Sequence, residues 1–200
     1  MSRLTSRLQH FPMTNSLFSG ERTALVALTQ GRVLELCFET AKNLHYYSPW
    51  VTDLTVVCLE GPARPSEHDA NDRGLRVERI FPGGDATRLP FDDAAFDWVV
   101  TTLTLCRMKH PAAMLSEVRR VLKPSGGYLF LEHGRGDDPS MRRRQASWRN
   151  LWMRLGECDI DLDIDGFVLA AGMRIERRER HQLGHPRFLS TMYRGLARRD

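Results

Sequence analysis

The 200-residue chain has few of the features that mark membrane proteins, secreted proteins or proteins with a structural zinc site. No apolar run approaches the roughly 20 residues that a membrane-spanning helix requires. It has only four cysteines, Cys37, Cys58, Cys106 and Cys158, and no two of them form a C-x-x-C pair. This wide spacing argues against a disulfide framework and against a zinc cage, so we expect reduced thiols and no metal site.

Lysine is nearly absent. Lys42, Lys109 and Lys123 are the only lysines, so the net charge of +4 comes from arginine. A nucleic-acid-binding surface needs basic residues clustered with stacking aromatics. Here Arg142 to Arg144 form one short run, and the arginines between 174 and 180 alternate with glutamates. These patterns are typical of a solvated charged face, and we expect no nucleic-acid partner.

The start of the chain also lacks a recognisable targeting signal. Residues 1–14 carry Arg3 and Arg7 but no continuous apolar segment and no small-residue cleavage motif. A cytoplasmic location without a membrane partner is therefore the expectation. We expect residues 1–20 to form an arm or short helix over the active-site face. Residues 21–200 have the length of a single α/β domain.

The hydrophobic pattern predicts alternating strands and helices. Short apolar runs bounded by turn-forming or polar residues predict strands at 32–36, 54–59, 75–80, 96–103 and 128–131. Apolar stripes, together with residues typical of helix beginnings and ends, predict helices at 111–122, 140–155 and 165–171. Between 40 and 47 there is room for only a brief helix. The tail predicts two more strands, at 173–181 and 188–198. This order indicates an α/β, Rossmann-like doubly wound sheet.

Four segments carry a family resemblance: GRVLE at 31–35, LE at 59–60, GDATRLPFDDAAFDWVV at 84–100 and EVRRVLKPSGGYLFLEH at 117–133. In this order and spacing they resemble the type-11 branch of the class I S-adenosylmethionine-dependent methyltransferases. The W-x-x-x-W helix, AAG at 170–172 and YRGLARR at 193–199 resemble its thiol-methyltransferase-like members. The resemblance implies a seven-stranded, mostly parallel sheet with an antiparallel C-terminal strand, S-adenosylmethionine as cofactor and a small-molecule acceptor.

Candidate cofactor residues follow from the sheet and from the resemblance. Ligands of an open parallel sheet bind beyond the carboxyl ends of its strands, and Glu60, ending the second strand, is placed to accept both ribose hydroxyls. The resemblance implies that Asp85 accepts the adenine amino group, that Ala86 offers its backbone N–H, and that Glu35 and Leu103 also lie around the cofactor. For Asp85 a turn or helix-cap role is the alternative.

The family's glycine-rich loop is missing. Its three glycine positions carry Cys37, Glu39 and Ala41. Glycines at such positions permit positive φ and close approach of the backbone to a ligand. We expect Cys37 and Glu39 to fill the space of the methionyl group. Repulsion between Glu39 and the cofactor carboxylate would be on the order of 4 kcal/mol at about 4 Å in an effective dielectric of about 20. Alternatively, Glu39 pairs with the cofactor's ammonium or turns outwards.

Two further residues are candidates for chemistry. His133, at the end of the fifth predicted strand, is the best-placed general base, with a structural hydrogen-bonded histidine as the alternative. Cys106 follows the fourth predicted strand and either faces the substrate or is a small buried thiol.

Three functional hypotheses remain open on sequence alone. The chain is a methyltransferase for a small molecule, or an inactive pseudo-methyltransferase that supports a second methyltransferase-like subunit or a homo-oligomer. The third hypothesis is an enzyme of this fold that performs chemistry without methyl transfer. The adenosine-side motifs favour the first hypothesis, and the substituted glycines favour the other two.

Overall fold

A computed structural model describes residues 16–37, 43–59, 88–155, 158–183 and 185–199, together with the backbone of 76–80. Its helices are α2 (Ser16–Val26), α3 (Pro111–Val121), α4 (Pro139–Arg154) and α5 (Ile164–Ala170). Short 3-10 turns are η1 (Leu44–Tyr46), η2 (Leu105–Arg107) and η3 (Arg187–Leu189). The strands are β1 (Gly31–Cys37), β2 (Val51–Cys58), β3 (Arg76–Ile80), β4 (Phe96–Thr102), β5 (Leu122–His133), β6 (Met173–Gln182) and β7 (Thr191–Arg199).

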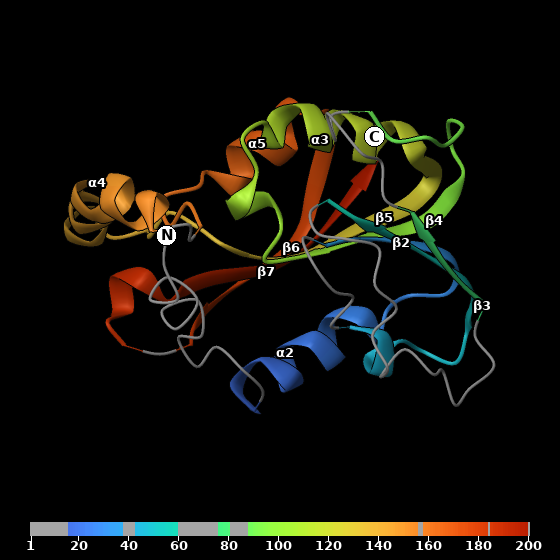
Figure 1. Cartoon of the computed structure of the whole chain (residues 1–200), viewed down its shortest axis with the longest axis horizontal. Coiled ribbons are helices and arrows are strands. Elements are labelled where there is room, and N and C mark those ends of the chain that lie inside the picture. Colours follow the sequence, from blue (N-terminus) through green and yellow to red (C-terminus); the bar gives the residue numbers. More distant parts are fainter. Residues whose placement is uncertain are drawn as a thin grey trace, which may run out of the picture.

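The strands form one seven-stranded sheet in the order β3-β2-β1-β4-β5-β7-β6 (Figure 1). Neighbouring strands from β3 to β5 pair in parallel, whereas β7 pairs antiparallel with both β5 and β6. The chain builds β2 and β3 on one side of β1 and then returns to β4 on the other side. The winding direction therefore reverses between β1 and β4, where ligands of such sheets bind. The fold class expected from the sequence is confirmed.

Helices cover both faces of the sheet, with α3 and α5 on one face and α2 on the other (Figure 1). Successive residues of a strand point to opposite faces, and β1 is buried on both. Leu34 and Leu36 belong to the core with α3 and α5, whereas Val33 and Cys37 belong to the core with α2. Glu35 lies two positions from both Val33 and Cys37 along the strand. Its side chain therefore points to the same face as theirs, the face covered by α2.

The strand β5 begins earlier than expected, directly after α3 at Leu122 rather than at residue 128. The expectation relied on apolar residues, whereas the first part of this strand is polar and glycine-rich. Gly127 pairs with Trp98 of β4, and a Cβ at Gly127 would lie 2.4 Å from the Trp98 ring. The glycine therefore serves close packing within the sheet, and it does not end the strand.

The N-terminal boundaries also differ from the expectation. The boundary between the N-terminal arm and the domain was expected between residues 20 and 21, but helix α2 starts at Ser16 and runs across it. Phe18, on the arm side of that boundary, is already buried. The expected arm before it, residues 1–15, lies outside the described residues. The brief helix expected between 40 and 47 is the turn η1, and residues 40–42 of that range lie outside the described residues.

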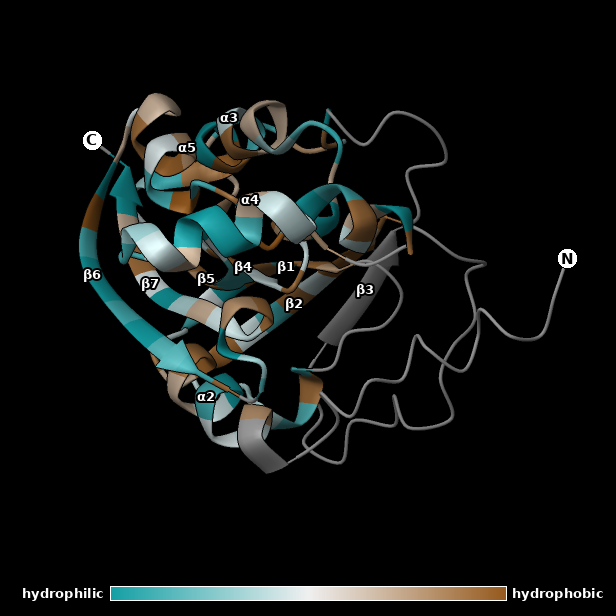
Figure 2. Ribbon diagram, turned by 90° about the vertical axis from the view of Figure 1, so that its left-hand side faces the viewer, coloured by the Kyte–Doolittle hydropathy of each residue, from teal (hydrophilic) through white to brown (hydrophobic). Residues whose placement is uncertain are grey.

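The outer strand β6 is largely hydrophilic along its length (Figure 2). Its exposed positions carry arginine and glutamate, which discourage pairing of the open edge with another strand. No helix among the described residues has the length and apolar character needed to cross a membrane.

Candidate functional site

Glu35, in the carboxyl-terminal half of β1, lies at the centre of a buried polar network. Its Oε2 accepts a hydrogen bond of 2.7 Å from the Tyr47 hydroxyl, and its Oε1 accepts one of 3.1 Å from the Asn43 amide. Arg22 of α2 donates to Oδ1 of Asn43 at 2.9 Å. Burial raises the pKa of Glu35 to about 7, against the lowering effects of the Tyr47 hydrogen bond and the Arg22 charge. Both oxygens of Glu35 are thus engaged by residues of this chain.

The same network reaches the end of β4. The Asn43 amide nitrogen also donates to Oγ1 of Thr102 at 2.9 Å. Asn43 is fully buried, so it ties the segment after β1 to the ends of both β1 and β4. Glu35 therefore positions the chain between Asn43 and Tyr47 beside the point where the winding reverses.

Cys37 and Leu103 lie at this same edge of the sheet. Cys37 is buried in the core on the α2 face, with its sulfur 3.3 Å from the sulfur of Cys58. Leu103, the first residue after β4, has a φ of +53°, and its N–H donates to the carbonyl of Leu131 at 2.8 Å. A left-handed leucine costs about 1–2 kcal/mol. The other expected cofactor residues, Glu39, Ala41, Glu60, Asp85 and Ala86, lie outside the described residues.

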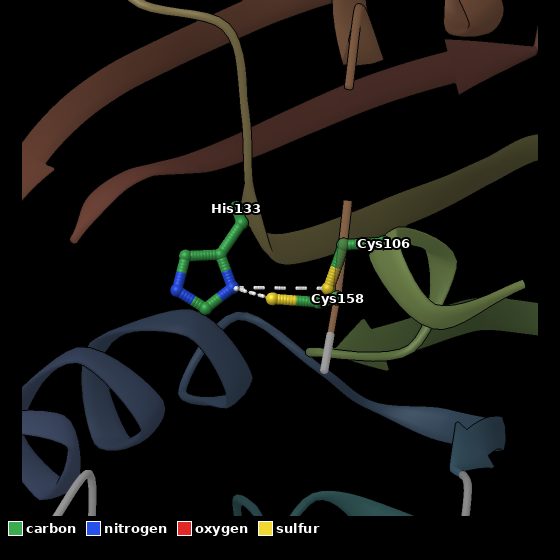
Figure 3. A group of neighbouring side chains, drawn as sticks. All are labelled: Cys106, His133 and Cys158. Carbon is green, nitrogen blue, oxygen red and sulfur yellow. Dashed lines mark hydrogen bonds between the residues drawn. The ribbon is translucent and has the colours of Figure 1, made fainter. Parts of the chain in front are cut away.

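His133, the last residue of β5, lies against two cysteine sulfurs (Figure 3). Its Nδ1 is 3.0 Å from Sγ of Cys158 and 3.8 Å from Sγ of Cys106. The three ligand atoms lie within 4.8 Å of one another, and all three residues are buried. Cys106 comes from η2, and Cys158 comes from the segment that precedes α5. We call Cys106, His133 and Cys158 the sulfur–histidine cluster.

The two thiols of the cluster differ in acidity. Burial raises the pKa of Cys106 well above its usual range. For Cys158, the hydrogen bond from Cys106 and the nearby His133 hold the pKa well below that range, against the opposing effect of burial. Cys158 is therefore the more acidic of the two.

Glu132, next to His133 on β5, anchors the turn that carries Cys106. Its fully buried carboxylate accepts the N–H of Thr104, at 3.0 Å on Oε1 and 2.9 Å on Oε2, and the N–H of Cys106 at 3.3 Å. Burial raises the pKa of Glu132, and these backbone hydrogen bonds oppose the rise. The side chain of Glu132 thus fixes backbone geometry at the cluster.

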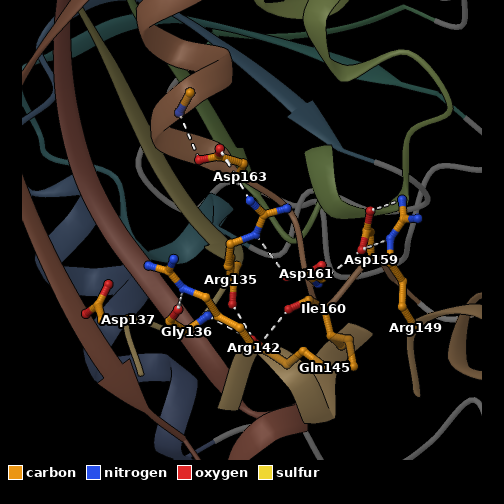
Figure 4. Close-up of polar contacts among 12 residues, drawn as sticks. Arg135, Gly136, Asp137, Arg142, Gln145, Arg149, Asp159, Ile160, Asp161 and Asp163 are labelled. Atoms are coloured by element: carbon orange, nitrogen blue, oxygen red, sulfur yellow. Dashed lines mark hydrogen bonds and ion pairs between the residues drawn. The ribbon is translucent and has the colours of Figure 1, made fainter. Parts of the chain in front are cut away.

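Gln145 of α4 joins the segments on either side of the cluster (Figure 4). Its amide oxygen accepts the N–H of Gly136 at 2.8 Å, and its nitrogen donates to the carbonyls of Gly134 at 3.1 Å and Ile160 at 2.8 Å. Gln145 is completely buried. One side chain therefore locks the chain after His133 to the chain after Cys158.

Two ion pairs reinforce the same junction from outside (Figure 4). Arg149 of α4 pairs with both oxygens of Asp159, at 2.8 and 2.7 Å. Arg135 pairs with Asp161 at 3.0 Å, and the backbone N–H of Arg135 donates to the carbonyl of Leu162 at 2.9 Å. The loop after β5 and the segment before α5 are held together by side-chain and main-chain contacts alike.

Sequence reasoning found part of this arrangement. It predicted His133 at the carboxyl edge of the sheet, and Cys106 is the buried thiol that was one of its two alternatives. It missed Cys158, Glu132 and Gln145. Cysteines that are widely spaced in the sequence need not be far apart in space. The fold brings Cys106 and Cys158 to the same histidine. Residue pairs 27 and 25 positions apart carry no local signal of their meeting.

Residues 31–131 match the methyltransferase domain family. Since the match covers half of the chain and the sheet has the order described above, the chain belongs to this family. Family membership assigns S-adenosylmethionine to the chain as its cofactor.

Two curated relatives illustrate the range of similar proteins. Human thiol S-methyltransferase TMT1B is 33% identical over 151 residues, which cover 70% of this chain and 55% of the relative. Demethylmenaquinone methyltransferase of Roseiflexus castenholzii is 33% identical over 134 residues, covering 65% of this chain and 56% of the relative. The chain thus spans about half the length of the curated relatives it matches.

Solved structures show the same fold at low identity. A Burkholderia thailandensis 1,6-didemethyltoxoflavin-N1-methyltransferase, solved with 1,6-didemethyltoxoflavin and S-adenosylhomocysteine, is similar with a TM-score of 0.67 and 13% identity, over 98% of this chain and 84% of that one. The [4+2]-cyclase SpnF is similar with a TM-score of 0.64 and 20% identity, over 91% of this chain and 79% of that one. One fold therefore serves different reactions in these neighbours.

Proposed function

We propose that this chain transfers a methyl group from S-adenosylmethionine to the sulfur of a small-molecule thiol. The observation that carries the proposal is the position of the sulfur–histidine cluster. Cys106 follows β4 and His133 ends β5, and these strands are parallel, so both residues lie at the carboxyl edge where this fold binds its ligands. The similarity to a protein named thiol S-methyltransferase supports the same acceptor.

The reaction needs a thiolate aligned with the methyl donor. The acceptor sulfur forms a bond to the methyl carbon while the bond between that carbon and the sulfonium sulfur breaks, and the acceptor must lose its proton. A thiolate is the reactive form of a thiol. In this proposal the acceptor thiol lies at the cluster and loses its proton there.

The position of Glu35 supports the proposed cofactor site. Glu35 lies in the carboxyl-terminal half of β1, beside the edge where the ammonium and carboxylate groups of the donor's amino-acid end would lie. Because Tyr47 and Asn43 occupy both of its oxygens, Glu35 would act by positioning the segment from 43 to 47. Direct contacts are proposed for Glu39, Ala41, Glu60, Asp85 and Ala86, with Cys37 and Leu103 shaping the edge beside them.

The experiment is a calorimetric titration of the chain with S-adenosylmethionine and S-adenosylhomocysteine, followed by an assay of S-adenosylhomocysteine release. The acceptors are matched thiols, alcohols and amines. Donor binding tighter than about 100 µM, near −5.5 kcal/mol, is expected. We expect release of S-adenosylhomocysteine with thiols only. Turnover with alcohols or amines but not with thiols would contradict the choice of acceptor.

A pseudo-methyltransferase is the second candidate, and the substituted glycine positions favour it. If Glu39 repels the cofactor carboxylate, Glu39→Gly should restore binding. A titration that stays silent in both the native chain and Glu39→Gly would reject the methyltransferase and leave the partner role, or chemistry without a methyl donor. Co-purification with a second methyltransferase-like chain would then separate these two.

A further inference from the structure

We propose that Cys106, His133 and Cys158 bind a zinc ion and leave its fourth coordination position open to the sulfur of the methyl acceptor. The zinc site stands on the geometry of the three side chains. Only the occupant of the fourth position rests on the proposed thiol methyl transfer.

The distances fit a tetrahedral zinc centre. Zinc bonds of about 2.3 Å to sulfur and about 2.0 Å to nitrogen place neighbouring ligand atoms roughly 3.5 to 3.8 Å apart at the tetrahedral angle. Nδ1 of His133 lies 3.0 Å from the sulfur of Cys158 and 3.8 Å from that of Cys106, and all three atoms fall within 4.8 Å. Small rotations of the thiols around a common centre would equalise these separations. This is the only such group of three found among the described residues.

The side chains point in the direction that coordination requires. The same ring nitrogen of His133 faces both sulfurs, and Nε2 lies on the opposite edge of the ring (Figure 3). One metal ion could therefore contact Nδ1 and both sulfurs without a change in the course of the backbone.

The donor set and its surroundings select a borderline-soft divalent ion. Two thiolates and one neutral imidazole favour zinc over the oxygen-seeking magnesium and calcium ions. The charges of zinc and two thiolates cancel, which suits a site within the apolar core that also contains Leu105 and Leu162. Binding would require both cysteines as thiolates, so any proton still held by either thiol would be released to solution.

The three ligands come from separate segments, and the chain fixes these segments relative to one another. Glu132 holds the turn of Cys106 beside β5, and the N–H of Asp159 donates to the carbonyl of Cys106 at 2.5 Å. Gln145 then joins the segments that follow His133 and Cys158. Supporting contacts of this kind orient metal ligands and commonly raise metal affinity 10 to 100-fold.

Three protein ligands and one open position are typical of catalytic zinc, whereas structural zinc has four protein ligands. An acceptor thiol entering that position would coordinate as a thiolate and give its proton to solution. After methyl transfer its sulfur is a neutral thioether, a weak ligand that can leave. With Nδ1 on the metal, Nε2 carries the ring proton, so His133 would act as a ligand and the metal would take the place of a base.

The test begins with the metal alone. The chain is stripped with a chelator, loaded with Zn²⁺ or Co²⁺ and dialysed, and its metal content and visible spectrum are measured. We expect about one metal per chain and, for cobalt, the intense d–d and thiolate charge-transfer bands of a tetrahedral site. Cobalt without thiolate bands, or a Cys106–Cys158 disulfide in a zinc-free native preparation, would overturn the proposal.

Variants assign the ligands. Metal binding should weaken by more than about 100-fold in each of Cys106→Ser, Cys158→Ser and His133→Gln. This loss exceeds the 10 to 100-fold loss expected from removing a residue that only orients a metal ligand. Cys58→Ser is the matched control, because Cys58 is an equally buried cysteine of the other close pair. Unchanged binding in Cys158→Ser, or loss in Cys58→Ser, would count against the site. The cobalt spectrum of the native chain decides the matter even where a cluster variant does not fold.

A last measurement separates this inference from the proposed function. Adding 2-mercaptoethanol to the cobalt-loaded chain without S-adenosylmethionine should increase the thiolate charge-transfer band. A cobalt spectrum that 2-mercaptoethanol leaves unchanged would reject the open fourth position. A spectral change without any methylated product would keep the zinc site and reject methyl transfer.

Discussion

The carboxylate of Glu132 receives the backbone N–H of Thr104 on both of its oxygens, at 3.0 and 2.9 Å. Thr104 lies between β4 and the η2 turn, and Glu132 immediately precedes His133. Through this contact the end of β5 sets the position of the turn that carries Cys106. The acidic residue beside the histidine is therefore an anchor for the cluster.

Glu132→Gln should destabilise the chain. The amide keeps one acceptor oxygen but turns an NH₂ group toward backbone N–H donors in a fully buried position. We expect a loss of about 1–3 kcal/mol in the free energy of unfolding, measured by urea denaturation. Zinc affinity should also fall about 10 to 100-fold, because the turn of Cys106 is no longer fixed.

Glu176→Gln is the matched control for this substitution. Glu176 pairs with Arg198 at 2.8 Å between β6 and β7, and its side chain is partly exposed. Exposed ion pairs contribute about 0–1 kcal/mol. A Glu132→Gln variant as stable as Glu176→Gln would show that the anchor is dispensable.

Glu35 should give the stability a distinct pH dependence. Its pKa is raised from an ordinary value of 4.5 to about 7 in the folded chain, so the folded state holds this proton more tightly than the unfolded state. The resulting contribution is fully present below about pH 4.5 and is lost as the pH rises to about 7 and beyond. The loss amounts to about 3 kcal/mol.

Glu35→Gln removes that titration. The amide also loses one of the two hydrogen bonds from Asn43 and Tyr47, which lowers stability by a constant amount at every pH. Urea denaturation at several pH values should therefore show the stability of the native chain falling relative to Glu35→Gln between about pH 4.5 and 7. Parallel stability curves would mean that Glu35 titrates at its ordinary pKa in the folded chain.

Gln145→Leu tests the bridge between the two sides of the cluster. The leucine leaves the N–H of Gly136 and the carbonyls of Gly134 and Ile160 buried without their partner. The expected loss is at least about 2 kcal/mol in the free energy of unfolding, since each unsatisfied buried group costs about 1–3 kcal/mol. Gln182→Leu, at an exposed glutamine of β6 that bonds to the carbonyl of Arg187, should cost less. Equal losses in the two variants would remove the special role of Gln145.

Most of the fold could be predicted from the sequence. Buried strands such as β2 and β4 carry short segments rich in apolar residues, and α3 has proline in its first turn and a single apolar stripe. The polar start of β5 escaped prediction because the role of Gly127 depends on the ring of Trp98 in the neighbouring strand. Such a contact exists only after the strands have paired.

The candidate site could be predicted only in part. His133 was predicted because it ends a buried strand at the edge that binds ligands, and Glu35 was predicted from the family resemblance; both stay predictions as site residues. Asn43 and Tyr47 escaped notice because nothing in their spacing shows that they close over Glu35. Cys158 escaped because it lies 25 positions from His133 in the sequence and meets it only in the folded chain.

The proposed acceptor atom is sulfur, and 2-mercaptoethanol tests this choice within one molecule because it carries a thiol and a hydroxyl. The chain is incubated with this acceptor and S-adenosylmethionine bearing a deuterated methyl group, and the product is identified by mass spectrometry and NMR. We expect a labelled thioether with a free hydroxyl. A labelled methyl ether, or no labelled product from a chain that binds the donor, would contradict this choice.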